Sequence, residues 1–528
     1  MKLRIDQGAV DRCRDLAQRI VAPVEDFIST HSTVSVERSV LRLLGVDGVL
    51  DEVPIVNRIV DALTPEQRAR GVATTFCAAL AETALEPPAL ALEFASGRQS
   101  PTAFEGVPVD ATRAIGKKFA AQGLARIAKT RETRTKMLAR LPQSPPPLLY
   151  VIVASGNIYE DRTAAVAAAE AGAQVIAVIR STGQSLLDFV PHGVTTEGFG
   201  GTYATQENFR VMRDALDEVS ERLGRYVMLT NYASGLCMPE IAVMAAFERL
   251  DMLLNDSMYG ILFRNINPKR TFIDQHFSRM LNAYSGIIIN TGEDNYLTTA
   301  DAVDQAPAVL ASQFINEQFA HRAGLPDRQI GLGDAFEIDP DREDGFLLEL
   351  AQAQLERQIF PNAPLKYMPP TKHMTGDIFK GHLIDAMFNL TSVMTHQTIH
   401  LCGMLTEGIH TPFLGDRALS LENARYIMST ARHLGDDLEC KPGGIIETRA
   451  NDVLQGAQAL LSRVQEHGLF EAIERSFFAD VSRAPDGGRG FEGVFAKDAQ
   501  YWNPFGELLS SAKHADNSPL TAAAGATS

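Results

Sequence analysis

Residues 148–154 read Leu-Leu-Tyr-Val-Ile-Val-Ala, and this short run decides the fold of the chain. It is continuous, apolar and rich in β-branched side chains, which is typical of a strand buried on both faces of a parallel sheet. The proline-rich stretch 141–147 before it stops any helix, because proline lacks an N–H and fixes φ. After it, Asp161 is expected to cap a helix that ends at Gly172. We therefore predict that a first βα unit of an α/β domain begins at residue 148.

Short apolar runs and amphipathic helical stretches continue to alternate along the chain. The clear strand candidates are 148–154, 175–179, 226–230, 252–254 and 286–290, and weaker ones are 329–332, 364–367 and 410–413. Eight parallel strands close a (β/α)₈ TIM barrel, and residues 148 to about 440 suit the size of such a barrel. A TIM barrel is the predicted fold, with an open doubly wound sheet as the alternative.

The flanking segments have other patterns. Apolar residues at helical spacing predict a helical N-terminal region over 1–140, and the barrel is expected over 141–440. Residues 441–509 are expected to form a small C-terminal extension. The small and polar residues of 510–528 predict a disordered tail.

Charge and composition exclude several classes of protein. The 528 residues include 49 Lys and Arg against 65 Asp and Glu, a net charge of −16, which disfavours nucleic acid and anionic membranes as partners. No uncharged apolar run reaches the roughly 18 residues that cross a bilayer. The five cysteines are widely spaced and lack C-x-x-C, which argues against a disulfide scaffold or a cysteine-rich zinc site. The chain start shows no signal peptide, so we expect a cytoplasmic protein.

Polar residues follow the predicted strands where these strands end. Arg180 follows the second strand, Ser234 the third, Arg264 the fourth and Asp294 the fifth. Any one of them can be explained as a cap or a turn residue. Because the carboxyl ends of parallel strands meet on one face, together they predict a site there.

The residue types in this set favour an anionic, aromatic ligand. Arg180 and Arg264 can make forked hydrogen bonds to phosphate or carboxylate. Ser185 and Ser234 can add hydroxyl donors, and Tyr259 can stack on an aromatic ring, although a single tyrosine is more often a packing residue. The loop 197–202 is rich in glycine but matches no phosphate-binding motif, so a flexible turn is the favoured interpretation.

Four histidines lie within 28 residues of one another, at 373, 382, 396 and 400. His396 and His400 are four residues apart on a predicted helix over 384–405, a spacing that permits metal binding. Carboxylates are sparse nearby, so ordinary helix packing is favoured and no metal site is predicted.

Several long segments resemble the large (α) subunit of lysine 5,6-aminomutase, and the resemblance runs from about residue 10 to 508. The segments are 33–54, 148–163, 175–210, 231–242, 259–267, 289–302 and 363–382. This resemblance implies a (β/α)₈ barrel isomerase that uses adenosylcobalamin and pyridoxal 5′-phosphate. It would move the terminal amino group of D-lysine or L-β-lysine to the adjacent carbon by a radical 1,2-shift. The resemblance also implies a small β subunit that carries the cobalamin, in an α₂β₂ heterotetramer.

The resemblance assigns roles to individual residues. The pyridoxal phosphate pocket would comprise Arg180, Ser185, Ser234, Tyr259, Arg264 and Asp294. Tyr259 and Asp294 would take part in the catalytic step. Lys366 would bind the substrate carboxylate, and Lys372 is the runner-up for that role.

The sequence also indicates whether this chain itself could bind cobalamin through a histidine. A histidine-ligated cobalamin module needs D-x-H-x-x-G, and the nearest match, residues 274–279, ends in arginine and lies in a predicted helix. This favours a separate partner and disfavours the related D-ornithine 4,5-aminomutase large subunit, in which that module is fused to the chain.

Two alternative functions stay open. One is a cobalamin-independent barrel lyase or isomerase acting on a phosphorylated substrate, and the other is a non-catalytic subunit that binds the cofactor or the partner.

Overall fold

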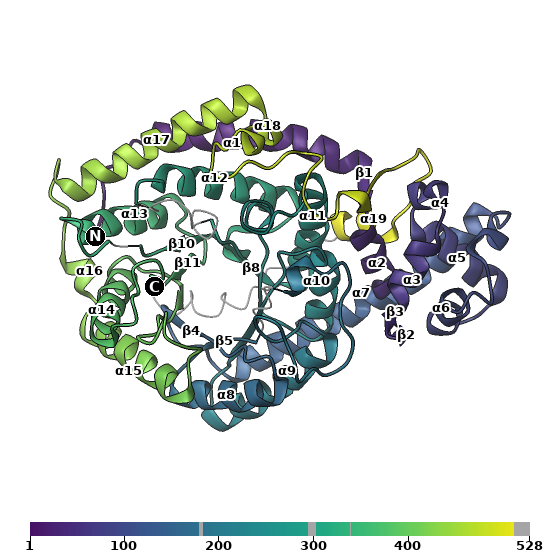
Figure 1. Cartoon of the computed structure of the whole chain (residues 1–528), viewed down its shortest axis with the longest axis horizontal. Helices are drawn as coiled ribbons and strands as arrows, with labels where there is room; N and C mark the ends of the chain where they lie inside the picture. Colours follow the sequence, from purple (N-terminus) through teal and green to yellow (C-terminus); the bar gives the residue numbers. More distant parts are fainter. Residues whose placement is uncertain (179–182, 294–302, 338, 512–528) are drawn as a thin grey trace.

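The computed structural model describes residues 1–178, 183–293, 303–337 and 339–511. A ring of parallel strands lies at its centre, with helices around it (Figure 1). The strands of the ring are β4 (Leu148–Ile152), β5 (Val175–Ala177), β6 (Met228–Tyr232), β7 (Met252–Leu254), β8 (Ile288–Asn290), β9 (Ile330–Gly331), β10 (Gly333–Ala335), β11 (Lys366–Met368) and β12 (Ile399–Leu401). The surrounding helices are α8 (Ile158–Ala171), α9 (Gln206–Leu223), α10 (Met238–Phe247), α11 (Pro268–Ser285), α12 (Ala306–Arg322), α13 (Gly345–Ile359), α14 (Ile378–Met394) and α15 (Leu414–Thr430).

The strand order shows how the ring closes. The sheet runs β10-β11-β12-β4-β5-β6-β7-β8-β9, and every pair is parallel. Only Leu332 separates β9 from β10 along the chain, so these two strands fill one position of the ring. The ring is completed through this segment, which gives the eight positions of a (β/α)₈ barrel. The predicted TIM barrel is confirmed, and the open sheet is not.

Alternate strand residues face the inside of the barrel, as the two-residue period of a strand requires. The inward residues form their own apolar cluster, separate from the cluster that packs against the helices. Its buried members are Met137, Leu141, Leu148, Tyr150, Val175, Ala177, Tyr226, Met228, Met252, Ile288, Ala335, Met368, Ile399 and Leu401. Met137 lies in the last turns of α7 (Val109–Arg140), and Leu141 follows that helix, so its end closes the amino-terminal side of the barrel.

A buried carboxylate fixes this closure. Asp251 accepts hydrogen bonds from Arg134 at 2.9 Å, from Arg213 at 3.1 Å and from the Tyr226 hydroxyl at 3.0 Å. The side chain of Asp251 is fully buried, and a buried charge of this kind is tolerated only when it is paired and hydrogen-bonded. Arg134 of α7 therefore joins the N-terminal region to the strands, and Arg213 joins the barrel helix α9 to them.

The segments before and after the barrel pack against each other. The N-terminal region comprises α1 (Gln7–Thr30), β1 (His31–Thr33), α2 (Val34–Leu43), β2 (Val49–Leu50), β3 (Val53–Pro54), α3 (Ile55–Ala62), α4 (Pro65–Arg70), α5 (Val72–Thr83), α6 (Pro87–Ala95), η1 (Pro101–Phe104) and α7. The C-terminal part comprises α16 (Leu434–Asp437), α17 (Ile445–His467), α18 (Leu469–Glu474), η6 (Phe491–Gly493), β13 (Val494–Ala496) and α19 (Pro504–Ser511). β1 pairs antiparallel with β13, and α1 packs along α17 and α12 across one side of the barrel (Figure 1). The two ends of the chain thus brace the barrel together.

Three sequence predictions about secondary structure were wrong. The last strand is Ile399–Leu401 and not 410–413, since α14 ends at Met394 and His396 has a φ of 54°, which breaks the helix predicted over 384–405. The cap of α8 is Asn157, whose side chain accepts from the Tyr159 N–H, and not Asp161. No described helix has the length and apolar character needed to span a membrane.

Candidate functional site

Ser185 and Ser234 come from neighbouring strands, and their loops are in direct contact. Ser185 lies in η2 (Gln184–Leu186), after β5, and Ser234 is buried in the loop after β6. A Cβ atom on Gly235 would stand 2.4 Å from the Ser185 Cα, and the Leu236 N–H donates to the Ser185 carbonyl at 3.0 Å. The loops can approach this closely only because residue 235 has no side chain.

Tyr259 and Arg264 lie on the next loop along the ring. After β7 the chain forms one π-helical turn, η3 (Tyr259–Phe263), followed by Arg264. Nη2 of Arg264 donates to the Tyr259 hydroxyl at 3.3 Å, and its guanidinium carbon lies 4.2 Å from the centre of the Phe263 ring. Gly260 lets this turn approach its neighbour, because a Cβ there would lie 2.7 Å from the Ser234 carbonyl oxygen. Three successive loops therefore bring Ser185, Ser234 and Arg264 to one end of the barrel.

Arg264 has a buried donor atom that the described part of the chain does not satisfy. Its Nε is buried and has no hydrogen-bond partner among the described residues. A buried donor without a partner costs about 1–3 kcal/mol, so a site that leaves one is poised for an acceptor on a ligand. A phosphate or carboxylate oxygen is the acceptor that a guanidinium group prefers.

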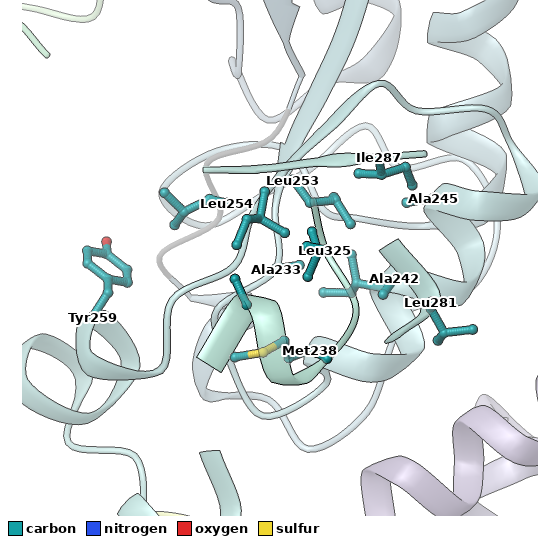
Figure 2. Close-up of a cluster of buried hydrophobic side chains, with 14 of the residues drawn as sticks. Ala233, Met238, Ala242, Ala245, Leu253, Leu254, Tyr259, Leu281, Ile287 and Leu325 are labelled. Carbon is teal, nitrogen blue, oxygen red and sulfur yellow. The ribbon is translucent and has the colours of Figure 1, made fainter. Parts of the chain in front are cut away.

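An apolar cluster lies beside these loops. Figure 2 shows Ala233, Met238, Leu253 and Leu254 close together to the right of the turn, with Tyr259 at the edge of the cluster and apart from its other members. Tyr259 is 9% exposed. The ring is therefore almost completely buried, and its centre lies 5.3 Å from that of the Phe263 ring.

The loop after β8 is held by two buried carboxyl groups. Glu293 accepts from the Gly333 N–H at 3.0 Å and from the Asn316 amide at 2.9 Å. Asp256, after β7, accepts from the Gly292 N–H at 3.0 Å and from the same Asn316 amide at 3.3 Å. Burial raises the pKa of both carboxyl groups above their ordinary values. This network fixes the chain up to the residue directly before Asp294.

Lys366 is on β11 and points into the barrel. Its Nζ lies 5.8 Å from the centre of the Tyr150 ring and 5.9 Å from that of Tyr232, which belong to β4 and β6. Lys366 is 1% exposed. An ammonium group held between two aromatic rings is a cation with which a small carboxylate can pair. Lys372, the runner-up, lies on the exposed loop after β11.

The structure brings together four of the six residues predicted for the cofactor pocket, namely Ser185, Ser234, Tyr259 and Arg264. Arg180 and Asp294 lie outside the described residues. Along the sequence, Arg180 stands four residues before Gln184, and Asp294 directly follows Glu293.

Sequence reasoning missed the residues that join the loops after β4 and β5. Asp161, which was expected to cap a helix, is buried and accepts from the Ser155 N–H at 2.7 Å and from the Thr202 hydroxyl. Thr202 in turn accepts from the Gly156 N–H at 2.8 Å. The glycine-rich segment 197–202 is thereby fixed against the loop after β4 at the same end of the barrel. In the sequence, the one indication of this contact was the position of Asp161, an acidic residue four positions after the helix-capping Asn157.

The four histidines do not share one helix. His400 lies on β12, where Nε2 contacts the Asn389 amide oxygen at 2.8 Å and the ring stacks on Phe388. Burial lowers the pKa of His400 to about 3, so this ring is neutral. His396 is at the surface with Asp436. Within the described ranges, the group whose side chains could converge on a metal ion is instead Asp47, His192 and Glu207, and two of these are exposed.

Comparison with known proteins decides the family. Residues 3–508 match the model of the D-lysine 5,6-aminomutase TIM-barrel domain of the alpha subunit. The chain is 56% identical over 512 residues to the lysine 5,6-aminomutase alpha subunit of Fusobacterium nucleatum, covering 96% of this chain and 99% of that one. It is 54% identical over 510 residues to the same subunit of Acetoanaerobium sticklandii, covering 96% and 98%. The chain belongs to the lysine 5,6-aminomutase alpha-subunit family.

A more distant relative differs from the lysine 5,6-aminomutase alpha subunits in how much of its length this chain covers. The D-ornithine 4,5-aminomutase subunit beta of Acetoanaerobium sticklandii is 28% identical over 382 residues, which cover 70% of this chain but 51% of that one. The lysine 5,6-aminomutase family thus matches the chain at both ends, whereas the ornithine enzyme carries a large part that this chain does not match. The family is one of isomerases, and the word subunit in its name implies a partner chain.

Proposed function

We propose that this chain is the large subunit of a lysine 5,6-aminomutase that depends on adenosylcobalamin and pyridoxal 5′-phosphate. The enzyme would shift the terminal amino group of D-lysine or L-β-lysine to the adjacent carbon. The observation that carries the proposal is the identity of 54–56% over nearly the whole chain to two lysine 5,6-aminomutase alpha subunits. A barrel enzyme without cobalamin and a non-catalytic subunit are not favoured by these relatives.

The described residues fit a pyridine phosphate. The buried Nε of Arg264 has no hydrogen-bond acceptor among the described residues, and the hydroxyl-bearing residues Ser185 and Ser234 lie on adjoining loops. Gly235 and Gly260 keep these loops close together. We infer that the serines and Arg264, with Arg180, hold the phosphate and the phenolic oxygen, and that Tyr259 lies against the ring. When bound, the two cofactors supply the radical and the temporary attachment of the migrating amine.

The chain's own residues orient the substrate and exclude water. Lys366 would bind the substrate carboxylate through its ammonium group, which keeps the far end of the lysine chain directed toward Tyr259. Asp294 would accept a proton or a hydrogen bond from the amine or from the cofactor. The apolar interior that surrounds Lys366 keeps water away from reactive species.

A partner chain would deliver the cobalamin. The nearest match to a cobalamin motif, Asp274 to Arg279, lies within α11, where Asp274 accepts from the Thr33 hydroxyl and His276 lies 3.1 Å from Glu25. These contacts support a packing role for the segment. We therefore propose a small cobalamin-binding β subunit in an α₂β₂ assembly. A cytoplasmic setting remains part of the proposal and is supported by the five widely spaced thiols, all of them buried.

The test is a reconstitution. The purified chain is mixed with its small subunit, adenosylcobalamin, pyridoxal 5′-phosphate and either D-lysine or L-β-lysine. The expected product is 2,5-diaminohexanoate from D-lysine or 3,5-diaminohexanoate from L-β-lysine. A fully assembled complex that forms neither product would refute the proposal, and turnover by the large subunit alone would favour a cobalamin-independent enzyme.

A further inference from the structure

Asp188 lies three residues after Ser185 and joins three parts of the molecule. Nη1 and Nη2 of Arg270, on α11, donate to its two carboxylate oxygens at 2.8 and 2.6 Å. Nη1 of Arg38, on α2, donates to its Oδ1 at 2.7 Å and to its carbonyl at 2.8 Å. The Asn57 amide donates to the same carbonyl at 3.0 Å. The loop that carries Ser185 is therefore held by the barrel and by the N-terminal region together.

Arg270 extends this contact to the next loop. It is fully buried, and its Nη2 also donates to the Leu236 carbonyl at 3.2 Å, two residues beyond Ser234. Its Nη1 donates to the Gly490 carbonyl at 3.2 Å, in the C-terminal extension. The guanidinium group of Arg270 thus donates to the loop of Ser185, to the loop of Ser234 and to the C-terminal extension. Arg270 lies six residues after Arg264.

The charge at Asp188 is stable at any physiological pH. Burial alone would raise the pKa of this carboxyl group, but the hydrogen bonds and charges of Arg270 and Arg38 lower it to about 2. Forked arginine–carboxylate pairs combine strength with fixed geometry. A small change in this geometry would displace Ser185 relative to Ser234, and displacements of about 1 Å are costly at a binding site.

We propose that Asp188 and Arg270 are positioning residues that hold Ser185 beside Ser234 for binding of the cofactor phosphate, with Arg38 as the arm through which the N-terminal region contributes. This inference rests on the proposed function, in which these serines bind pyridoxal 5′-phosphate. It gives the N-terminal helices a role in the site although they supply no residue of the predicted pocket.

The chain offers a matched control. Asp217, on α9, is also paired with two arginines, Arg213 at 2.9 Å and Arg249, and its side chain is 30% exposed against 33% for Asp188. It lies near Tyr226 at the amino-terminal side of the barrel, away from the site loops. Asp188→Asn and Asp217→Asn therefore remove equivalent charges at opposite ends of the barrel.

The experiment measures the apparent Kd of the assembled complex for pyridoxal 5′-phosphate by absorbance titration, together with the melting temperature. Asp188→Asn is expected to raise the Kd at least tenfold, and Asp217→Asn to leave it within twofold at a similar loss of melting temperature. The inference is overturned if Asp188→Asn binds like the wild type, or if Asp217→Asn weakens binding equally. A wild-type complex that binds no pyridoxal phosphate, or that binds it without forming a diamino acid, would instead refute the proposed function.

A double-mutant cycle separates positioning from general stability. If Asp188 acts through Ser185, Asp188→Asn should raise the Kd less than threefold in a Ser185→Ala background, because the contact it supports is already lost. Independent, multiplicative effects of the two changes would contradict the inference. Should Asp188→Asn not fold, Arg38→Gln leaves the Arg270 pair intact, and the same cycle with Ser185→Ala decides between the two outcomes.

Discussion

The side-chain amide of Asn316 donates a hydrogen bond to Oε1 of Glu293, with 2.9 Å between the two atoms. The same amide donates to Oδ1 of Asp256 at 3.3 Å. One neutral side chain on α12 thus serves two buried carboxyl groups and joins the loops after β7 and β8. The loop that leads to Asp294 and the turn that carries Tyr259 consequently share one support.

Asn316→Ala is expected to lower the free energy of unfolding by about 2 kcal/mol or more, since each buried polar group that loses its partner costs about 1–3 kcal/mol. Urea denaturation of the purified chain measures this change. Ser312→Ala is the matched control on the same helix, because the Ser312 hydroxyl is buried and has no hydrogen-bond partner within the described ranges. Equal stability of the Asn316→Ala variant and the wild type would show that the bridge contributes nothing.

Gly235→Ala is expected to weaken cofactor binding by a steric effect. The new Cβ would stand 2.4 Å from the Ser185 Cα, so the loop after β5 must shift away from the loop after β6. We expect the apparent Kd for pyridoxal 5′-phosphate to rise at least tenfold in the assembled complex. At Gly415 an added Cβ meets nothing within 4 Å, so Gly415→Ala should bind like the wild type. Unchanged binding by Gly235→Ala would mean that the contact between the two loops is irrelevant to the site.

Glu356→Gln is expected to change how stability depends on pH. Burial raises the pKa of Glu356 to about 8, so the folded chain binds this proton more tightly than the unfolded chain does. The resulting stability is present below the ordinary pKa of 4.5 and is lost as pH rises through about 8. The Gln352 amide donates a hydrogen bond to Oε1 of Glu356. Glutamine at position 356 keeps this acceptor oxygen and does not ionise.

The variant should therefore gain stability relative to the wild type as pH rises from 5 to 9, by an amount on the order of 4 kcal/mol. Thermal unfolding at several pH values measures the difference. Glu422→Gln, at an exposed position of α15, should give a difference that does not vary with pH. A stability difference for Glu356→Gln that is flat or falls with pH would contradict the assignment.

The barrel was predictable because local pattern and tertiary structure agree over most of it. Residues 148–154 are apolar on both faces of the expected strand. The observed strand β4 is accordingly buried on both faces, between the barrel interior and the surrounding helices. The strand at Ile399–Leu401 was not predictable, because His400 interrupts its apolar pattern. Its ring is accommodated by Asn389 and Phe388 of α14, and these contacts exist only once the barrel has formed.

The residues that could touch a ligand were easier to predict than those that hold them. Ser234 and Arg264 follow strands, and their chemistry is evident from residue type. Asp188 and Asn316 act through partners 82 and 23 residues away, Arg270 and Glu293. The pairing of such distant residues depends on the order of strands around the ring, which no local pattern in a single sequence contains.

Lys366→Met tests the proposed substrate contact. Methionine preserves the length and apolar stem of the side chain but removes the ammonium group that lies between the rings of Tyr150 and Tyr232. Loss of a buried charged contact costs about 2–5 kcal/mol, so we expect the KM for lysine to rise at least about 30-fold. The apparent Kd for pyridoxal 5′-phosphate should stay within twofold of the wild-type value, because Lys366 lies on β11 and not on the loops of the phosphate site. Steady-state kinetics and absorbance titration of the assembled complex measure the two quantities.

Lys372→Met is the paired control and decides between the two lysines. Lys372 lies on an exposed loop six residues beyond Lys366, so its replacement should leave KM unchanged if Lys366 is the anchor. A large rise in KM with Lys372→Met, and none with Lys366→Met, would move the carboxylate site from the barrel interior to the loop after β11.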